Sequence, residues 1–286
     1  MNGKNNQVVI IMVVFCCSKK EVFYFTTKIT NLGEFIMKEF NYKEVGKEIG
    51  WSFAKINPIV ENPSGFNYYK EVTNLIGNET VMLDIGCGSA EKAVRYFSFA
   101  KEIFETDNEI EMLKKAQVNA EKYYETNPNT KSKFKFQIMD CNGKFPFDDG
   151  MFDVVVSRHC GANMNEVFRV LKQGGAFVSE DYWCGDCIEL KQMFERGQDY
   201  GKQPLYTSVF AECEKAGFSE IKLVRFEQIE FYKSLEELKY LLLHTPILNG
   251  YDEKADDEIL EKYAEKYKTK KGIKLSRKLY AFILKK

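Results

Sequence analysis

The stretch VMLDIGCGSAE, residues 81–91, places an acidic residue and two closely spaced glycines directly after a short apolar run. A short apolar run that stops at glycine is typical of a buried strand. Ligands bind to parallel sheets where the carboxyl ends of the strands meet, and the turn after this run would lie at that edge. Gly86 and Gly88 have no side chains, so ligand atoms can approach the backbone there.

Apolar runs of similar length follow at a regular rhythm, with helical patterns between them. This alternation predicts an α/β fold with right-handed crossovers, in which helices cover both faces of a parallel sheet. Asn108 and Glu111 have the spacing of a capping box at the start of one helix. The predicted strands are 81–85, 101–106, 133–140, 152–157, 176–181, 221–232 and 277–286, and the predicted helices are 108–124, 162–172, 206–218, 234–248 and 256–269.

The composition narrows the possible partners. The 286 residues are 44% apolar, which is enough for a full core, and 41 Lys and Arg nearly balance 42 Asp and Glu. No basic face for nucleic acid is therefore expected. The eight irregularly spaced cysteines favour reduced thiols and a cytoplasmic location over a disulfide scaffold. Cys184 and Cys187 have the spacing of a metal or redox pair, but a zinc site needs four ligands and no second such pair exists, so no metal is expected.

The N-terminal segment needs its own explanation. The apolar run at 8–17 is shorter than the about 20 residues that a membrane-spanning helix needs, and no small-residue cleavage site follows it. Gly33 and Glu34 can be encoded by a purine-rich ribosome-binding sequence shortly before Met37. We therefore predict that Met37 is the physiological start and that residues 1–36 are a translated leader, with a signal peptide as the alternative and no membrane partner.

Two nucleotide chemistries use such a glycine loop. Dinucleotides need a third glycine in G-x-G-x-x-G, where a helix N-terminus approaches the pyrophosphate, and Glu91 occupies that position. S-adenosylmethionine has no phosphate but carries an ammonium and a sulfonium group, which Asp84 can help to accommodate. The loop therefore favours S-adenosylmethionine over NAD.

At this point the chain resembles the class I S-adenosylmethionine-dependent methyltransferases at several ordered positions. VMLDIGCGSA is similar to their first motif, with Ala90 where a third glycine is usual. ETDNEIEML (105–113) resembles the segment after their second strand, MDCNGKFPFDDGMFDVVVS (139–157) resembles their third and fourth motifs, and VFRVLKQGGAFVSED is similar to their passage into the fifth strand. The resemblance implies a doubly wound, mostly parallel seven-stranded sheet with an antiparallel last strand, and methyl transfer that needs no metal.

The domain plan combines the local patterns with this resemblance. We expect an N-terminal helical cap at 37–79 and a Rossmann-like methyltransferase domain at 80–286, with a helical insertion at 234–271 before the last strand. The cap and the insertion would border the substrate pocket.

The resemblance also implies which residues hold the cofactor. Asp107 matches the carboxylate that binds the ribose hydroxyls, since a carboxylate can accept both hydroxyl protons. Asp140 matches the residue near the adenine amino group, and Cys141 offers a backbone N–H there. The implied cofactor-binding residues are Asp84, Gly86, Cys87, Gly88, Asp107, Met112, Asp140, Cys141 and Ser157.

The acceptor side is predicted from the segments after the fourth and fifth strands. His159 is either a general base near neutral pH or a packed strand-end residue. Arg158 would orient an anionic group or pair with a nearby acid. Tyr182 and Trp183 are candidates to line the pocket. Trp51 is a candidate lid residue, with packing inside the cap as the alternative.

These residues lead us to expect a small-molecule acceptor. The net charge of −1 argues against RNA, and the Asn/Asp-Pro-Pro-aromatic signature of amino methylation is absent at 157–160. Methylation of RNA or protein is the alternative among enzymes. A module that binds S-adenosylmethionine without catalysis is the alternative from another class.

Overall fold

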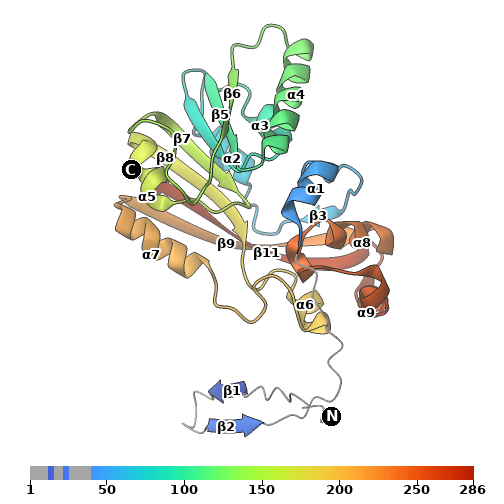
Figure 1. Ribbon diagram of the computed structural model, residues 1–286. Coiled ribbons are helices and arrows are strands. Elements are labelled where there is room, and N and C mark those ends of the chain that lie inside the picture. The colour runs from blue at the N-terminus through green and yellow to red at the C-terminus, as the bar shows by residue number, and fades with distance from the viewer. Residues whose placement is uncertain (1–11, 16–21, 26–39) are drawn as a thin grey trace, which may run out of the picture. The chain divides into compact units, whose positions relative to one another are not determined.

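The computed structural model describes residues 12–15, 22–25 and 40–286 (Figure 1). In the N-terminal unit, β1 (Met12–Phe15) pairs antiparallel with β2 (Val22–Phe25). The predicted start at Met37 lies outside the described residues. Among the residues described, no helix is both long enough and apolar enough to cross a membrane.

The second unit, Glu39–Lys286, is built on one sheet of nine strands. The strands are β3 (Ile59–Glu61), β4 (Val81–Ile85), β5 (Glu102–Asp107), β6 (Lys133–Ile138), β7 (Phe152–Arg158), β8 (Leu171–Tyr182), β9 (Glu220–Tyr232), β10 (Lys268–Thr269) and β11 (Gly272–Lys285). Their order is β3-β9-β11-β8-β7-β4-β5-β6, with β10 paired to β11. The five strands from β8 to β6 are parallel, and β11 is antiparallel to both of its neighbours. The predicted mostly parallel fold with an antiparallel last strand is confirmed, with β3 and β10 as two short additions.

Helices cover both faces of this sheet (Figure 1). They are α1 (Tyr42–Ile49), α2 (Tyr68–Thr73), α3 (Glu91–Tyr96), α4 (Ile110–Thr126), α5 (Met164–Val170), α6 (Ile188–Phe194), α7 (Tyr206–Ala216), α8 (Leu235–Leu243), the 3-10 helix η1 (Pro246–Leu248) and α9 (Glu253–Lys266). On one face, Met82 and Ile103 pack with residues of α2, α3 and α4. On the other, Leu83 and Val155 pack with residues of α5 and α7. Successive side chains along each strand therefore point to opposite faces and pack into two separate apolar layers.

The start of α4 differs from the sequence prediction. The helix begins at Ile110 with Glu109 at its N-cap, and no side chain caps it there, so the predicted capping box of Asn108 and Glu111 is wrong. The Glu109 N–H instead donates to Asp107 Oδ1 at 2.9 Å. Asp107, the last residue of β5, thus caps the helix start in place of the predicted residues, because its carboxylate lies next to the Glu109 N–H.

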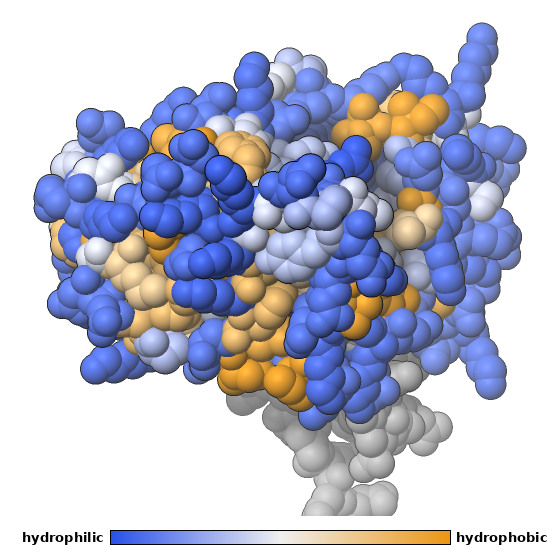
Figure 2. Space-filling model, turned by 90° about the horizontal axis from the view of Figure 1, so that it is seen from above, coloured by the Kyte–Doolittle hydropathy of each residue, from blue (hydrophilic) through white to orange (hydrophobic). Residues whose placement is uncertain are grey.

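The cap and the insertion pack on the extended part of the sheet. β3 pairs antiparallel with β9, so the predicted cap is not helical alone. A three-residue strand is too short for its periodicity to show in the sequence. The insertion between β9 and β11 consists of α8, η1, α9 and β10, and its apolar residues share a core with those of α6. Figure 2 shows mostly hydrophilic residues on one face of the molecule, with apolar groups between them.

Candidate functional site at the carboxyl edge of the sheet

The glycine loop after β4 is held by backbone bonds from the neighbouring strand. Gly86 and Gly88 have positive φ angles of 71° and 57°, which favour glycine. The N–H groups of Gly86 and Cys87 both donate to the Thr106 carbonyl at 2.9 Å. A Cβ atom on Gly86 would lie 2.6 Å from the Cys160 side chain, so a larger residue would displace the turn after β7. Contacts with β5 and with that turn therefore support the conformation of the loop.

Asp107 lies at the carboxyl end of β5, beside this loop. Its Oδ2 accepts from the Gly88 N–H at 3.0 Å, and Oδ1 accepts from Glu109. Burial raises its pKa, while these two N–H groups act in the opposite direction. Each carboxylate oxygen has a further lone pair, so the side chain can still accept from a ligand hydroxyl.

A second acidic residue, which the sequence analysis did not single out, lies beneath the loop. Glu105 in β5 stands opposite Asp84 in β4, and its side chain is fully buried. Desolvation and the charge of Asp84 raise the pKa of Glu105 well above its usual range. Desolvation also raises the pKa of Asp84, to about 7. The sequence pattern showed Glu105 only as a polar residue within a strand, and nothing local marks such a residue as buried.

Cys141 and Cys160 meet on the other side of the loop. Cys141 follows β6, and its carbonyl accepts from the Asn163 N–H at 2.8 Å. A hydrogen bond from the Cys160 thiol lowers the pKa of Cys141 to about 7. Asp140 bonds the N–H of Asn142 at 2.9 Å, which shapes the same turn. The turn after β6, which carries the residues predicted to lie near the adenine, is therefore tied to the segment after β7.

Three of the predicted cofactor residues, Gly88, Met112 and Ser157, are buried. Met112 is 1% exposed in α4, and its side chain packs beneath α1, where a Cβ on Gly46 would lie 3.1 Å from Met112 Cε. Ser157 is fully buried, and its hydroxyl donates to the Cys160 carbonyl at 2.6 Å. In this structure neither the Met112 nor the Ser157 side chain is therefore open to a ligand.

His159 stands in the turn after β7 with a positive φ of 56°. Its ring stacks on Tyr182, with centroids 4.4 Å apart, and Nδ1 lies 3.8 Å from Asp181 Oδ1. Burial lowers the pKa of His159 well below its usual range, so the imidazole is neutral at neutral pH. Desolvation raises the pKa of Asp181 to about 6, which leaves this carboxyl mostly charged at neutral pH. A neutral imidazole beside a carboxylate can accept a proton.

The other predicted acceptor residues differ in their surroundings. Arg158 Nε donates to Glu180 Oε1 at 2.8 Å, so an acid of the neighbouring strand already pairs with it. Tyr182 lies between His159 and the Arg277 guanidinium, which is 4.2 Å from its ring centroid. Trp183 packs against the core on the α5 and α7 face. Of these, Tyr182 is the residue in direct contact with the candidate base.

Trp51 lies against the glycine loop. A Cβ atom on Gly88 would be 3.8 Å from Trp51 Cδ1, and the rings of Phe40 and Tyr42 lie 6.2 and 5.9 Å from the Trp51 ring. Lys115 Nζ in α4 donates to the carbonyl of Gly46 at 2.8 Å and so anchors the end of α1. The cap thus places an aromatic cluster over the loop.

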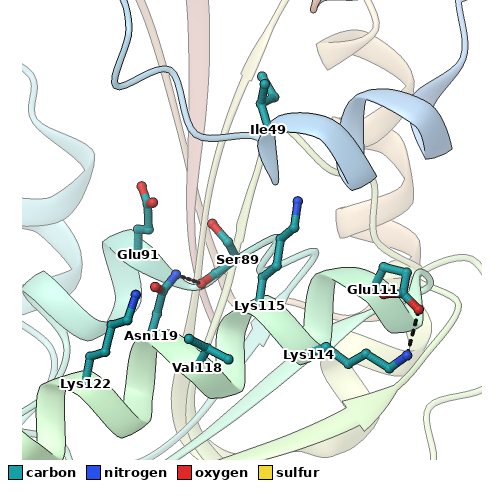
Figure 3. Close-up of a pocket in the computed structure, with 9 residues that line it drawn as sticks. All are labelled: Ile49, Ser89, Glu91, Glu111, Lys114, Lys115, Val118, Asn119 and Lys122. Carbon is teal, nitrogen blue, oxygen red and sulfur yellow. Dashed lines mark hydrogen bonds and ion pairs between the residues drawn. The ribbon is translucent and has the colours of Figure 1, made fainter.

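A hollow of about 360 Å³ lies between α1 and α4 (Figure 3). Its lining includes Ser89, Glu91 and Lys115, with Asn119 donating to the Ser89 carbonyl at 2.8 Å. None of the residues predicted to bind cofactor or substrate lines it. The hollow is therefore separate from the site that the sequence predicts at the carboxyl edge of the sheet.

The residues at that edge fit a cationic cofactor. Asp84, Glu105 and Asp107 surround the glycine loop, and within residues 40–286 no lysine or arginine forms an ion pair with any of them. Acidic groups without a paired cation disfavour a pyrophosphate and favour an ammonium or sulfonium group. The same stretch holds no group of three or more His, Cys, Asp or Glu placed to bind a metal ion.

Comparisons with known proteins agree with this fold. A candidate methyltransferase from Bacillus halodurans C-125 is 18% identical, with a TM-score of 0.52, over 76% of this chain and 96% of the other. A functionally unknown protein from Deinococcus radiodurans R1 is 16% identical, also with a TM-score of 0.52, over 85% and 97%. A search of curated proteins gives no match.

The sequence model of a protein family carries the assignment further. The family described as "Methyltransferase domain" matches residues 76–262, which is well over half of the chain and spans the sheet from before β4 into α9. The matched region includes the glycine loop, Asp107 and the turn that carries His159. The chain therefore belongs to the methyltransferase-domain family, and it is a class I S-adenosylmethionine-dependent methyltransferase.

Proposed function

We propose that the protein methylates a small-molecule acceptor bound between the glycine loop and the carboxyl ends of β7 and β8. The observation that carries this proposal is the aromatic cluster that α1 and its flanking residues place over the glycine loop. Trp51 lies against Gly88, and the Tyr42 ring lies 5.9 Å from the Trp51 ring. An aromatic cluster that covers the cofactor loop in this way would favour a small acceptor over a macromolecule.

The cofactor contacts follow from the same geometry. S-adenosylmethionine supplies the methyl group on its sulfonium sulfur. Asp107 would accept hydrogen bonds from the ribose hydroxyls, and Asp84 would face the amino-acid end. The backbone N–H of Cys141 would bond the adenine, with Asp140 next to it. Aligning the acceptor with the methyl carbon then supplies most of the rate enhancement.

His159 is the proposed general base. Its Nδ1 faces Asp181, so a proton on Nδ1 would leave Nε2 free to accept a proton from the acceptor. Asp181 would hold this tautomer and stabilise the imidazolium that forms. Tyr182, stacked on the ring, fixes its plane.

The function is tested with the full chain and methyl-labelled S-adenosylmethionine. A cell extract is divided into small molecules, RNA and protein, and label is expected in the small-molecule fraction. Label found only in nuclease-sensitive material or only in protein would overturn the proposed acceptor class. Tight cofactor binding with no label in any fraction would identify a non-catalytic module.

The role of His159 is tested with the acceptor fraction that carries the label. His159→Gln should lower kcat by about 10²–10⁴-fold and leave cofactor affinity unchanged. His244→Gln is the matched control, because His244 lies at the end of α8 and bonds the Tyr240 carbonyl. Equal rates for wild type and His159→Gln would exclude His159 as the base.

A further inference from the structure

Glu105 is the least expected residue near the cofactor loop. Its side chain is fully buried in the middle of β5, on the sheet face where Met82 and Ile103 are also fully buried. Among the described residues, neither of its carboxyl oxygens has a hydrogen-bond partner in good geometry. A buried polar group without a partner is costly, so one that a fold retains calls for an explanation.

The groups around Glu105 do not supply a positive charge. Asp84 lies opposite Glu105 on β4. The Cys87 thiol, in the glycine loop, lowers the pKa of Glu105 but carries no positive charge. Around Asp84 are Asp107 and Arg158, and Arg158 is already paired with Glu180. The remaining titratable neighbours are the phenols of Tyr68 and Tyr69 from α2, whose pKa values are raised by burial first and also by Asp84. The two facing carboxyl groups therefore lack a cation of their own.

Two carboxyl groups side by side in an apolar layer cannot both be charged at low cost. Desolvation raises the pKa of both acids, that of Asp84 to about 7. At neutral pH the ligand-free pair therefore retains at least one proton. A positive charge placed beside the pair would favour its release, as an opposite charge favours the ionised form of any acid.

We propose that Asp84 and Glu105 form a carboxyl pair that holds a shared proton in the ligand-free protein and releases it to solvent when the ammonium group of the cofactor binds. This proposal rests on the proposed cofactor contacts. The pair gains one negative charge, the ammonium group keeps its positive charge, and one proton enters the buffer. Glu105 acts here as a positioning residue, through Asp84.

The test measures protons by calorimetry of the full chain with S-adenosylhomocysteine, which keeps the ammonium group and cannot react. Titrations near neutral pH in two buffers of different ionisation enthalpy give the number of protons released. The second ligand is 5′-methylthioadenosine, which keeps the adenosine but lacks the amino-acid end. Proton release is expected with the first ligand and not with the second.

The variants isolate Glu105. For one proton with a pKa near 7, wild-type affinity should rise about tenfold between pH 6 and pH 8, and Glu105→Gln should reduce this to less than about twofold. Any change in the protonation of the ligand itself affects wild type and Glu105→Gln equally, so it does not alter the difference between them. Glu102→Gln is the control, because Glu102 is on the same strand but pairs with Lys135 near the surface. It should behave as wild type.

The outcomes separate this proposal from the proposed function. Equal proton release by wild type and Glu105→Gln, or equal release with both ligands, would overturn the carboxyl pair. A folded wild-type protein that binds neither S-adenosylmethionine nor S-adenosylhomocysteine would overturn the cofactor contacts instead. If Glu105→Gln does not fold, the comparison of the two ligands on the wild-type protein still decides.

Discussion

Two groups of buried acids in this protein have opposite surroundings. In the first, Arg277 Nε donates to Asp186 Oδ1 at 2.9 Å and Nη1 donates to Glu230 Oε2 at 3.0 Å. In the second, Asp84 and Glu105 face each other without a cation of their own. The first group contains its own cation, Arg277, and we call it the complete group. The second lacks a cation, which we propose the cofactor supplies, and we call it the incomplete group. The difference separates acids that hold the structure together from acids placed for a ligand.

The largest effect is expected from breaking the complete group. Arg277→Leu would leave the buried Asp186 and the partly buried Glu230 without their cation and should lower the free energy of unfolding by about 3–5 kcal/mol. Urea denaturation of the full chain measures this change. The neighbouring Lys278→Ala, whose side chain is 27% exposed, is the control. A loss below about 1 kcal/mol for Arg277→Leu would contradict the view that Arg277 is the cation that stabilises Asp186 and Glu230.

The incomplete group should respond in the opposite direction. Because burial raises the pKa of both acids, the native state binds more protons than the unfolded state from about pH 4 upward, and for Asp84 this difference extends to about pH 7. Wild-type stability therefore falls as the pH rises through this range. Glu105→Gln removes the part of this cost that belongs to Glu105 and should stabilise the ligand-free protein by about 1–3 kcal/mol near pH 8, and by less near pH 5.

Denaturant unfolding at both pH values, with Glu102→Gln as the control, checks the sign and the pH dependence. A Glu105→Gln protein that is less stable than wild type near pH 8 would contradict the cost of the pair.

Asp107 is intermediate between the two groups, because protein N–H groups bond it while it also borders the cofactor loop. Asp107→Ala should weaken binding of S-adenosylmethionine by about 1–3 kcal/mol through loss of charge-assisted hydrogen bonds. Calorimetry measures the change, and Asp107→Asn keeps the size of the side chain as a second variant. Unchanged affinity in both would place the ribose elsewhere.

The smallest effect is expected at an exposed pair. Lys262 Nζ lies 2.6 Å from Glu258 Oε1 in α9, and both side chains are mostly exposed. Lys262→Ala should change the free energy of unfolding by less than about 0.5 kcal/mol, because solvent screens the pair. A larger change would mean that the contribution of an ion pair to stability depends more on the distance between its charges than on their burial. That result would contradict the comparison of the two buried groups.

Much of the fold could be predicted from the sequence because its signals are local. β4 has the predicted bounds, and the glycine loop and Asp107 lie together at the sheet edge as expected. The burial of Glu105 could not be predicted, since it depends on β4 and the helices that cover β5, which are distant in the chain. The strand β3 was missed for a related reason, because three residues carry no period and its partner β9 follows far along the chain.

The candidate site shows the same limit. The turn after β7 was predicted to carry His159, but its stacking on Tyr182 and its approach to Asp181 depend on the register between β7 and β8. The start of β8 at Leu171, where a helix was predicted to end at 172, also reflects pairing with β7. Cross-strand pairing is a property of two segments, and neither segment shows it alone.

The position of β11 between β8 and β9 has a consequence for synthesis on the ribosome. Both partners of β11 precede it along the chain, and α8, η1 and α9 separate it from β9. A nascent chain therefore exposes an unpaired edge of β8, and a β9 that pairs only with the short β3, until β11 emerges. Such edges can recruit strands from other chains. The interval during which the insertion is translated is thus the period when the growing protein is most exposed to misassociation, and chaperone contacts at β8 and β9 would matter most then.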